Sequence, residues 1–255
     1  MEIKIGTSGY SFDDWVGPFY PEKTKKGKML DYYIKHFNTV EINSTYYRIP
    51  HPAIMANIEK KTPDNFEFII KAPGTLTHKR YKIEKDIIDF KECIEPITNS
   101  GKLKGVLAQF PFSFKHNEKN LDYVYYCNHL LQDYSLFVEF RHDSWVNREM
   151  YDMFKKSKIG YVSVDEPDLP GLIKPELFNT IDTGYIRLHG RNAKQWWNGG
   201  ALRYDYDYSE AELNEWREKI KKLENKAKKL YIFFNNCHLG QAVKNAKELT
   251  ERLNL

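Results

Sequence analysis

The sequence is poor in cysteine and has no long apolar segment, and these two absences exclude several classes of protein. Its three cysteines, Cys93, Cys127 and Cys237, are far apart and odd in number, which rules out a disulfide framework and a compact cysteine-bound metal knot. The N-terminus carries no apolar run of signal-peptide length, and no run elsewhere is long enough to cross a membrane. We therefore expect a cytoplasmic protein without a membrane segment.

A strong charge of one sign is also missing, as are the common catalytic and nucleotide-binding motifs. The 39 basic and 35 acidic residues leave a formal net charge of +4. That surplus is too small to indicate nucleic-acid binding, although a local basic cleft could lie within it. There is no Walker loop, GxGxxG fingerprint, nucleophile elbow or HExxH zinc motif.

Eight short β-rich segments recur along the chain, and most are followed by a segment with helical periodicity. The strand candidates are residues 3–8, 39–44, 66–72, 105–110, 136–140, 161–165, 185–189 and 231–235. The helical candidates are residues 27–37, 52–62, 84–98, 118–131, 147–158, 209–229 and 239–255. This alternation in 255 residues predicts an α/β fold of the (β/α)8 TIM-barrel type. No linker or shift in composition divides the chain, so we expect a single domain over residues 1–255.

Two connections depart from the regular pattern. Residues 166–179 carry three prolines, which predicts a short or broken sixth helix. Residues 190–209, after the seventh strand, are too long and too rich in glycine and tryptophan for a plain turn. A loop of this kind is commonly a lid or a binding segment.

Polar and apolar residues alternate in several of these strands, although a strand covered on both faces is usually apolar throughout. In residues 137–141, Val138 and Phe140 point to one side while Glu139 and Arg141 point to the other. Because the apolar set is expected to face the helices, we expect the polar set to face the barrel axis. The same rule predicts the following residues at the inner, carboxyl-terminal rim: Ser8, Glu41, Asn43, Lys71, Gln109, Asp165, Arg187, His189 and Asn235.

The predicted rim and its loops are rich in cations and aromatic rings. Lys71, His78, Arg141, Arg187, His189 and Arg191 outnumber the acids Glu41, Glu139 and Asp165. This balance favours an anionic ligand, with guanidinium groups suited to phosphate or carboxylate. The loops add Tyr10, Trp15, Tyr20, Tyr46, Tyr47, Trp145, Trp196, Trp197, Tyr204 and Tyr206. Rings beside guanidiniums suit a sugar or nucleobase whose phosphate is held, whereas Trp15 and Tyr20 are expected to plug the barrel mouth.

Two functions are compatible with such a rim. The first is an enzyme acting on a phosphorylated sugar, a nucleotide or a nucleic-acid backbone by acid and base catalysis. The second is a non-catalytic protein that binds nucleic acid or a phosphometabolite with the same groups. The catalytic candidates are Glu41, Glu139, Asp165 and His189. The candidate substrate-binding residues are Asn43, Tyr46, Lys71, His78, Gln109, Arg141, Trp145, Arg187, Arg191, Tyr204 and Asn235.

The catalytic candidates raise two further alternatives. They could ligate a divalent metal ion, but the arginines two positions before and after His189 would repel one. The polar groups could also satisfy one another as an internal network, through pairs such as Glu139 with Arg187 and Glu41 with Lys71. Such a network would stabilise a core poorly, because replacing a buried ion pair by apolar residues is often neutral or better.

Seven ordered segments also resemble a known family over essentially the whole chain. They are IGTSGYSFDDWVGPFYP, FNTVEINSTYYRIP, FEFIIKAPGTLTH, LAQFPFSF, VEFRHDSW, YIRLHGR and YIFFNNCHLGQAVKNA. They resemble the DUF72 family of uncharacterised proteins, which implies a TIM barrel and no established reaction. The resemblance points to Glu41, Asn43, Thr77, His78, Gln109, Glu139, Arg141, Trp145, Arg187, His189 and Asn235. The family is similar to the endonuclease IV and sugar isomerase barrels, but this sequence lacks the several histidines of a multi-zinc cluster.

Overall fold

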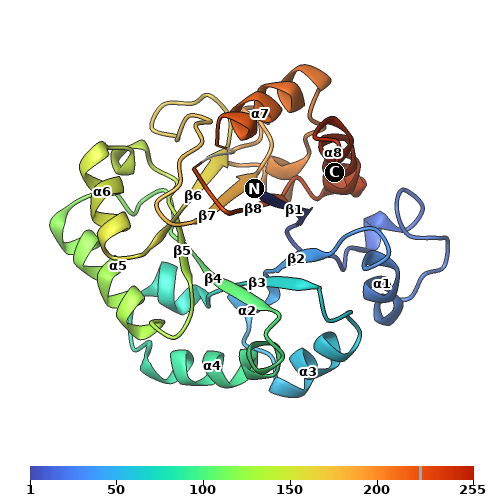
Figure 1. Cartoon of the computed structure of the whole chain (residues 1–255), viewed down its shortest axis with the longest axis horizontal. Helices are drawn as coiled ribbons and strands as arrows, with labels where there is room; N and C mark the ends of the chain where they lie inside the picture. Colours follow the sequence, from blue (N-terminus) through green and yellow to red (C-terminus); the bar gives the residue numbers. More distant parts are fainter. Residues whose placement is uncertain (224–225) are drawn as a thin grey trace.

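The computed structural model describes residues 1–223 and 226–255, which contain a barrel of eight parallel strands (Figure 1). The strands are β1 (Glu2–Thr7), β2 (Thr39–Ile42), β3 (Glu67–Lys71), β4 (Leu103–Gln109), β5 (Leu136–Glu139), β6 (Gly160–Asp165), β7 (Thr183–Leu188) and β8 (Lys229–Phe234). They follow the order β1-β8-β7-β6-β5-β4-β3-β2. A bridge between Ser8 and Glu41 brings β1 and β2 together and nearly closes the barrel. The predicted (β/α)8 TIM barrel is confirmed.

Helices surround the strands on the outside of the barrel (Figure 1). They are α1 (Lys26–Tyr33), α3 (Pro52–Lys60), α4 (Glu84–Asn99), α5 (Glu118–Leu130), α6 (Arg148–Lys156), α7 (Glu210–Leu223) and α8 (Gln241–Arg252). The short helix α2 (Ser44–Tyr47) directly follows β2 at the mouth of the barrel. The predicted helix over 209–229 was too long, because β8 already begins at Lys229. Residues 224–225 of that prediction lie outside the described residues. None of the described helices combines the length and apolar content needed to span a bilayer.

The two irregular connections agree with the sequence. Between Asp165 and Thr183, the described chain contains turns and bends but no regular helix, as the three prolines predicted. After β7, the described chain runs from residue 189 to residue 209 with a single short 3-10 helix, η4 (Gly200–Tyr204). This long β7–α7 loop belongs to the carboxyl-terminal end of the barrel, where TIM barrels build their sites.

The amino-terminal part of the barrel interior is a packed core. Phe137 of β5 lies between Gly105 of β4 and Gly160 of β6, and a Cβ on either glycine would come within 2.4 Å of its ring. The large ring and the two missing side chains therefore fit together across three strands. Tyr185 of β7 packs edge-on against the same ring, with centroids 5.2 Å apart. Packed rings therefore fill this part of the interior.

Trp15 and Tyr20 also behave as expected for residues that plug the structure. Both are fully buried, and their rings stack with centroids 6.2 Å apart. The Trp15 indole N–H donates to the carbonyl of Cys237 at 2.6 Å, which ties the first loop to the segment after β8. Both rings therefore belong to the core, and neither lines the cavities described below.

Candidate functional site

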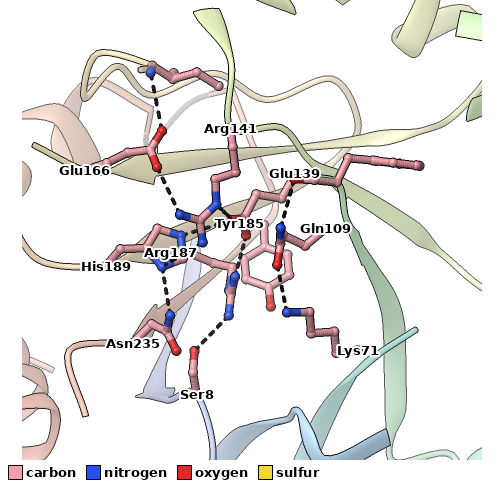
Figure 2. A network of polar contacts seen from close by, with 12 residues as sticks. Ser8, Lys71, Gln109, Glu139, Arg141, Glu166, Tyr185, Arg187, His189 and Asn235 are labelled. Carbon is pink, nitrogen blue, oxygen red and sulfur yellow. Dashed lines mark hydrogen bonds and ion pairs between the residues drawn. The ribbon is translucent and has the colours of Figure 1, made fainter. Parts of the chain in front are cut away.

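Arg187 is the centre of a buried ionic network in the barrel (Figure 2). Its Nη2 donates to Glu41 Oε1 at 2.7 Å and its Nε to Glu41 Oε2 at 2.8 Å, while its Nη1 donates to Glu139 Oε2 at 2.6 Å. Tyr185 and Asn43 donate to the same Glu41 carboxylate. Burial opposes the charge on Arg187, but the two carboxylates outweigh it and raise its pKa well above the usual value. The guanidinium is thus fully engaged inside the protein.

Glu139 links Arg187 to a second guanidinium. Arg141 Nε donates to Glu139 Oε1 at 2.5 Å, and Arg141 Nη1 donates to Glu166 Oε2 at 3.1 Å. Burial disfavours the ionised form of Glu139, but the two arginines outweigh it and hold its pKa well below its usual range. Glu166 is in the opposite state, because burial dominates over Arg141 and raises its pKa to about 8. One carboxyl is therefore a fixed anion, and the other takes up a proton far more readily.

His189 completes the network as a neutral imidazole. Burial, reinforced by Arg141, lowers its pKa to about 3. Its Nε2 lies 3.1 Å from Glu139 Oε1, and its Nδ1 lies 2.9 Å from Asn235 Nδ2 and 3.4 Å from an Arg141 nitrogen. Because the carboxylate can only accept and the amide and guanidinium nitrogens can only donate, the proton of His189 resides on Nε2. Both ring nitrogens are then occupied within the protein.

Lys71 stands at the end of β3 above this network and faces the open mouth. Its Nζ donates to Gln109 Oε1 at 2.8 Å and lies 4.3 Å from the centre of the Tyr46 ring. Gln109 is fixed in turn, because its Nε2 donates to the carbonyl of Phe110 at 2.9 Å. Burial, with a smaller effect from Arg187, lowers the pKa of Lys71 to about 7. A large share of this amine is therefore neutral near neutral pH.

Two adjoining cavities open above the network, with volumes of about 350 and 460 Å³. Both are lined by Tyr47, Lys71, Gln109, Arg141, Arg203 and Tyr204. The smaller one is completed by rings and acids that include Tyr46, His78, Phe112, Glu166, Trp196 and Trp197. The larger one reaches Ser8, Asn43, Arg187 and Asn235. The buried Asn43 Oδ1 has no hydrogen-bond partner in the described part of the chain.

His78 belongs to the smaller cavity but not to the network. It comes from the π-helix η2 (Thr75–Lys79), where its Nδ1 lies 2.9 Å from the hydroxyl of Thr77. Its ring meets Tyr46 edge-on, with centroids 5.0 Å apart. Burial and the nearby Lys71 lower the pKa of His78 to about 4, so it is neutral at physiological pH.

Asp165 faces the helices, so its predicted orientation toward the axis is wrong. In the register of β6 and β7, Asp165 pairs with Leu188 while Val164 pairs with Arg187, and paired residues of parallel strands share a face. The inner residues of β6 are therefore Val162 and Val164. The alternation was misassigned because polar residues of this strand lie on its outer face.

Arg191, a predicted ligand-binding cation, leaves the mouth together with Asp165. Its Nε and Nη2 donate to the Asp165 carboxylate at 2.8 and 2.7 Å, and its guanidinium also contacts Glu212 and Glu215 of α7. The indole of Trp216 donates to Asp165 from the same helix. This cluster fastens β6 and the start of the β7–α7 loop to α7, which contradicts the predicted role of Arg191 at the mouth.

Trp145 is likewise misplaced by the sequence prediction. It is fully buried, stacks on Phe140 with centroids 3.9 Å apart, and donates from its indole to the carbonyl of Phe114 at 2.6 Å. The 3-10 turn η3 (Asp143–Trp145) folds back after β5 and directs this ring onto the outer face of the sheet. Trp145 is part of the core and does not line the cavities described above.

Sequence reasoning missed Glu166, Arg203 and Phe112, which line the cavities. The sequence did contain a signal for Glu166, because it directly follows Asp165. If Asp165 is assigned to the outer face, as the strand register requires, Glu166 faces inward. Arg203 lies in the irregular β7–α7 loop and Phe112 in the loop after β4, where no periodicity assigns a direction. Arg203 and Phe112 can therefore be identified as cavity residues only from the tertiary structure.

The network also decides between the pairs that the sequence left open. The pair of Glu139 with Arg187 is confirmed, whereas Glu41 pairs with Arg187 and not with Lys71. The catalytic candidates do not fit a divalent ion, because guanidiniums engage Glu41 and Glu139 and because Asp165 points away. In the described residues, no three His, Cys, Asp or Glu side chains gather as a metal site.

The fold and the site together define a class of protein. It is a TIM barrel with a buried ionic network beneath a mouth lined by cations and aromatic rings. The chain belongs to the DUF72 family, since the family described as "Protein of unknown function DUF72" matches residues 4–255. It is 33% identical over 271 residues to the UPF0759 protein YunF of Bacillus subtilis, covering 99% of this chain and 95% of that protein.

Solved structures of DUF72 family proteins share the fold. One from Thermotoga maritima is 41% identical, with a TM-score of 0.92 over 100% of both chains. One from Enterococcus faecalis is 28% identical, with a TM-score of 0.89 over 99% of this chain and 96% of that chain. None of these names states an activity, so the function has to be argued from the mouth itself.

Proposed function

We propose that this protein is an enzyme that binds a phosphorylated sugar or a nucleotide in the barrel mouth and transforms it there. The observation that carries the proposal is the pair of adjoining cavities in which cations and aromatic rings face one ligand-sized space. Their volumes lie in the range of small-molecule sites, which favours a small anion over a nucleic-acid duplex. Arg203 supplies a cationic fork for phosphate beside the positive charge of Arg141, and Tyr46 and Tyr204 supply ring faces.

The acid and base groups of this proposal differ from those expected from the sequence. Glu139 and His189 make all their strong contacts inside the network, and neither lines the cavities. Glu166 and Lys71 line the cavity and have pKa values moved to about 8 and about 7. A carboxyl with a raised pKa and a partly neutral amine at one site suit proton transfer and attack on a ligand near neutral pH. Glu166 is thus the proposed acid, and Lys71 supplies the proposed reactive lone pair.

A binding panel tests the anionic ligand. Trp196 and Trp197 line the cavity, so tryptophan fluorescence should respond to a ligand there. We expect sugar phosphates or nucleoside monophosphates to bind and their unphosphorylated forms to bind more weakly. Arg203→Ala should weaken the binding about tenfold or more, because it removes a charge-assisted contact to phosphate.

The matched control is Arg217→Ala on α7, which removes a similarly half-buried arginine far from these cavities. Equal effects of the two variants, or equal affinity for phosphorylated and unphosphorylated compounds, would contradict the proposal. Affinity for single-stranded nucleic acid that falls steeply with salt would instead favour a polyanion as the partner. Binding without product formation would leave the non-catalytic alternative.

A further inference from the structure

Lys71 differs from Arg141 and Arg187 because its hydrogen-bond partner is uncharged. Arg141 and Arg187 each contact two carboxylates within 3.1 Å, whereas no carboxylate lies within ion-pair distance of Lys71 in the described chain. Its Nζ is held by the amide oxygen of Gln109, which is uncharged. A neutral acceptor orients an amine without requiring that it be protonated.

Burial disfavours the ammonium form of Lys71, and the charged groups around it do not offset this effect. Burial lowers its pKa most and Arg187 and Arg141 lower it further, while Glu139 and Glu41 raise it by less than this total. Both carboxylates already neutralise guanidiniums, as described above. His78 faces the same space from η2 as a neutral ring. An amine in such surroundings is a nucleophile, because a desolvated lysine beside other cations keeps its lone pair near neutral pH.

The position of Lys71 gives a ligand access to that lone pair. The residue lines both cavities, so an attached ligand has space on either side. Arg203 and Tyr204 of η4 line the same space from the opposite loop. A phosphate on Arg203 and a ring against Tyr204 would therefore leave the other end of a small ligand directed at the amine.

We propose that Lys71 is a catalytic nucleophile that forms an imine with the carbonyl carbon of a phosphorylated ligand. This inference rests on the proposed function, because it names the chemical class of the ligand in the same mouth. The lone pair of Nζ forms a C–N bond as the carbonyl oxygen takes up a proton, which gives a carbinolamine. The C–O bond then breaks, water leaves and nitrogen loses its second proton. One amine and one carbonyl give one imine and one water, with no oxidant or reductant.

Reductive trapping tests the inference directly on the full chain. The probe is pyridoxal 5′-phosphate, which combines an aldehyde, an aromatic ring and a phosphate. The protein is mixed with it at pH 7, reduced with sodium borohydride and mapped by peptide mass spectrometry. An ordinary lysine has a pKa of about 10.4 and is less than about 0.1% neutral at this pH. We therefore expect at least about tenfold more reduced adduct on Lys71 than on the exposed Lys79 nearby, and competition by inorganic phosphate.

Two variants and a binding readout separate the possible failures. Lys71→Arg keeps a cation but removes the nucleophile, so it should still bind the probe and lose the dominant adduct. Lys79→Arg should keep both. If the probe quenches tryptophan fluorescence and phosphate displaces it, yet Lys71 is labelled no more than Lys79, the imine inference fails and the proposed function stands. If the probe neither binds nor labels Lys71, both fail.

Discussion

His189 shows how burial and neighbours set the chemistry of a single residue. Its two nitrogens contact groups of opposite hydrogen-bonding character, which fixes one neutral tautomer, and its pKa falls to about 3. A histidine held in this way cannot supply a proton near neutral pH. We therefore infer that this catalytic candidate supports Glu139, and that the reactive groups of the proposed function lie above it.

The pH dependence of stability follows from this state. A folded pKa below the ordinary value of about 6.5 means that unfolded His189 binds a proton more readily than folded His189. The contribution of His189 to the free energy of unfolding is therefore complete above pH 6.5 and is lost as the pH falls toward 3. We expect His189→Gln to reduce the slope of the free energy of unfolding against pH by up to about 1.4 kcal/mol per pH unit. Urea unfolding at several values between pH 4 and 7 measures this slope.

The matched control is His116→Gln, which makes the same substitution at an exposed histidine outside the network. The pKa of Glu139 is also lowered, so protonation of Glu139 at acid pH reduces stability in both variants and in the wild type. A residual slope is therefore expected. Parallel curves for the wild type and His189→Gln would contradict the assignment of a neutral, buried imidazole.

At the scale of elements, the register of β6 decides which polar residues reach the mouth. Paired residues of neighbouring strands lie on the same face of the sheet. Gln109 pairs with Glu139, and Val164 pairs with Arg187, so all four residues face the barrel interior. The alternation within β6 alone gives the opposite answer, because its outer residue Asp165 is compensated by partners on α7. Sequence periodicity identifies two faces, but long-range pairing decides which face is inner.

The Asp165 cluster should matter for stability and not for ligand binding. Asp165→Asn leaves Arg191 and Trp216 with a weaker acceptor at a fully buried position. We expect the free energy of unfolding to fall by about 3 kcal/mol in a denaturant titration. Affinity for sugar phosphates or nucleotides should change little, because the carboxylate points away from the cavities.

Trp216→Phe is a milder companion that removes one donor and keeps a ring in place. It should lower stability in the same direction by about 1 kcal/mol. If Asp165→Asn instead unfolded like the wild type but lost ligand binding, Asp165 would belong to the ligand site, as its sequence position first indicated.

At the scale of the whole molecule, the barrel could be predicted because eight strands of the right length alternate with helical segments. The inner positions of Glu41, Lys71, Gln109, Glu139, Arg187 and His189 could also be predicted, since charged residues in covered strands must converge on shared partners. The location of Trp145 could not, because a 3-10 turn reverses the chain after β5. Arg203 and Glu166 lie in segments where direction depends on contacts distant in sequence.

The division of the interior into layers connects these observations. Packed rings fill the amino-terminal part, the ionic network fills the middle, and Lys71 with the loop aromatics borders the open end. The network neutralises most of the charge it contains and holds Arg141 in place below the cavities. Catalytic chemistry is therefore expected at the border between the network and the cavity, where Lys71 and Glu166 lie.

The most direct test is a crystal structure of the protein soaked with ribose 5-phosphate, which carries a phosphate, a sugar ring and a latent aldehyde. We predict phosphate oxygens within about 3.5 Å of Arg203, Arg141 or Lys71, with the sugar against Tyr46 or Tyr204. Ligand density confined to another surface, or an empty mouth in crystals of protein that binds ribose 5-phosphate in solution, would contradict the assignment of the barrel mouth as the functional site.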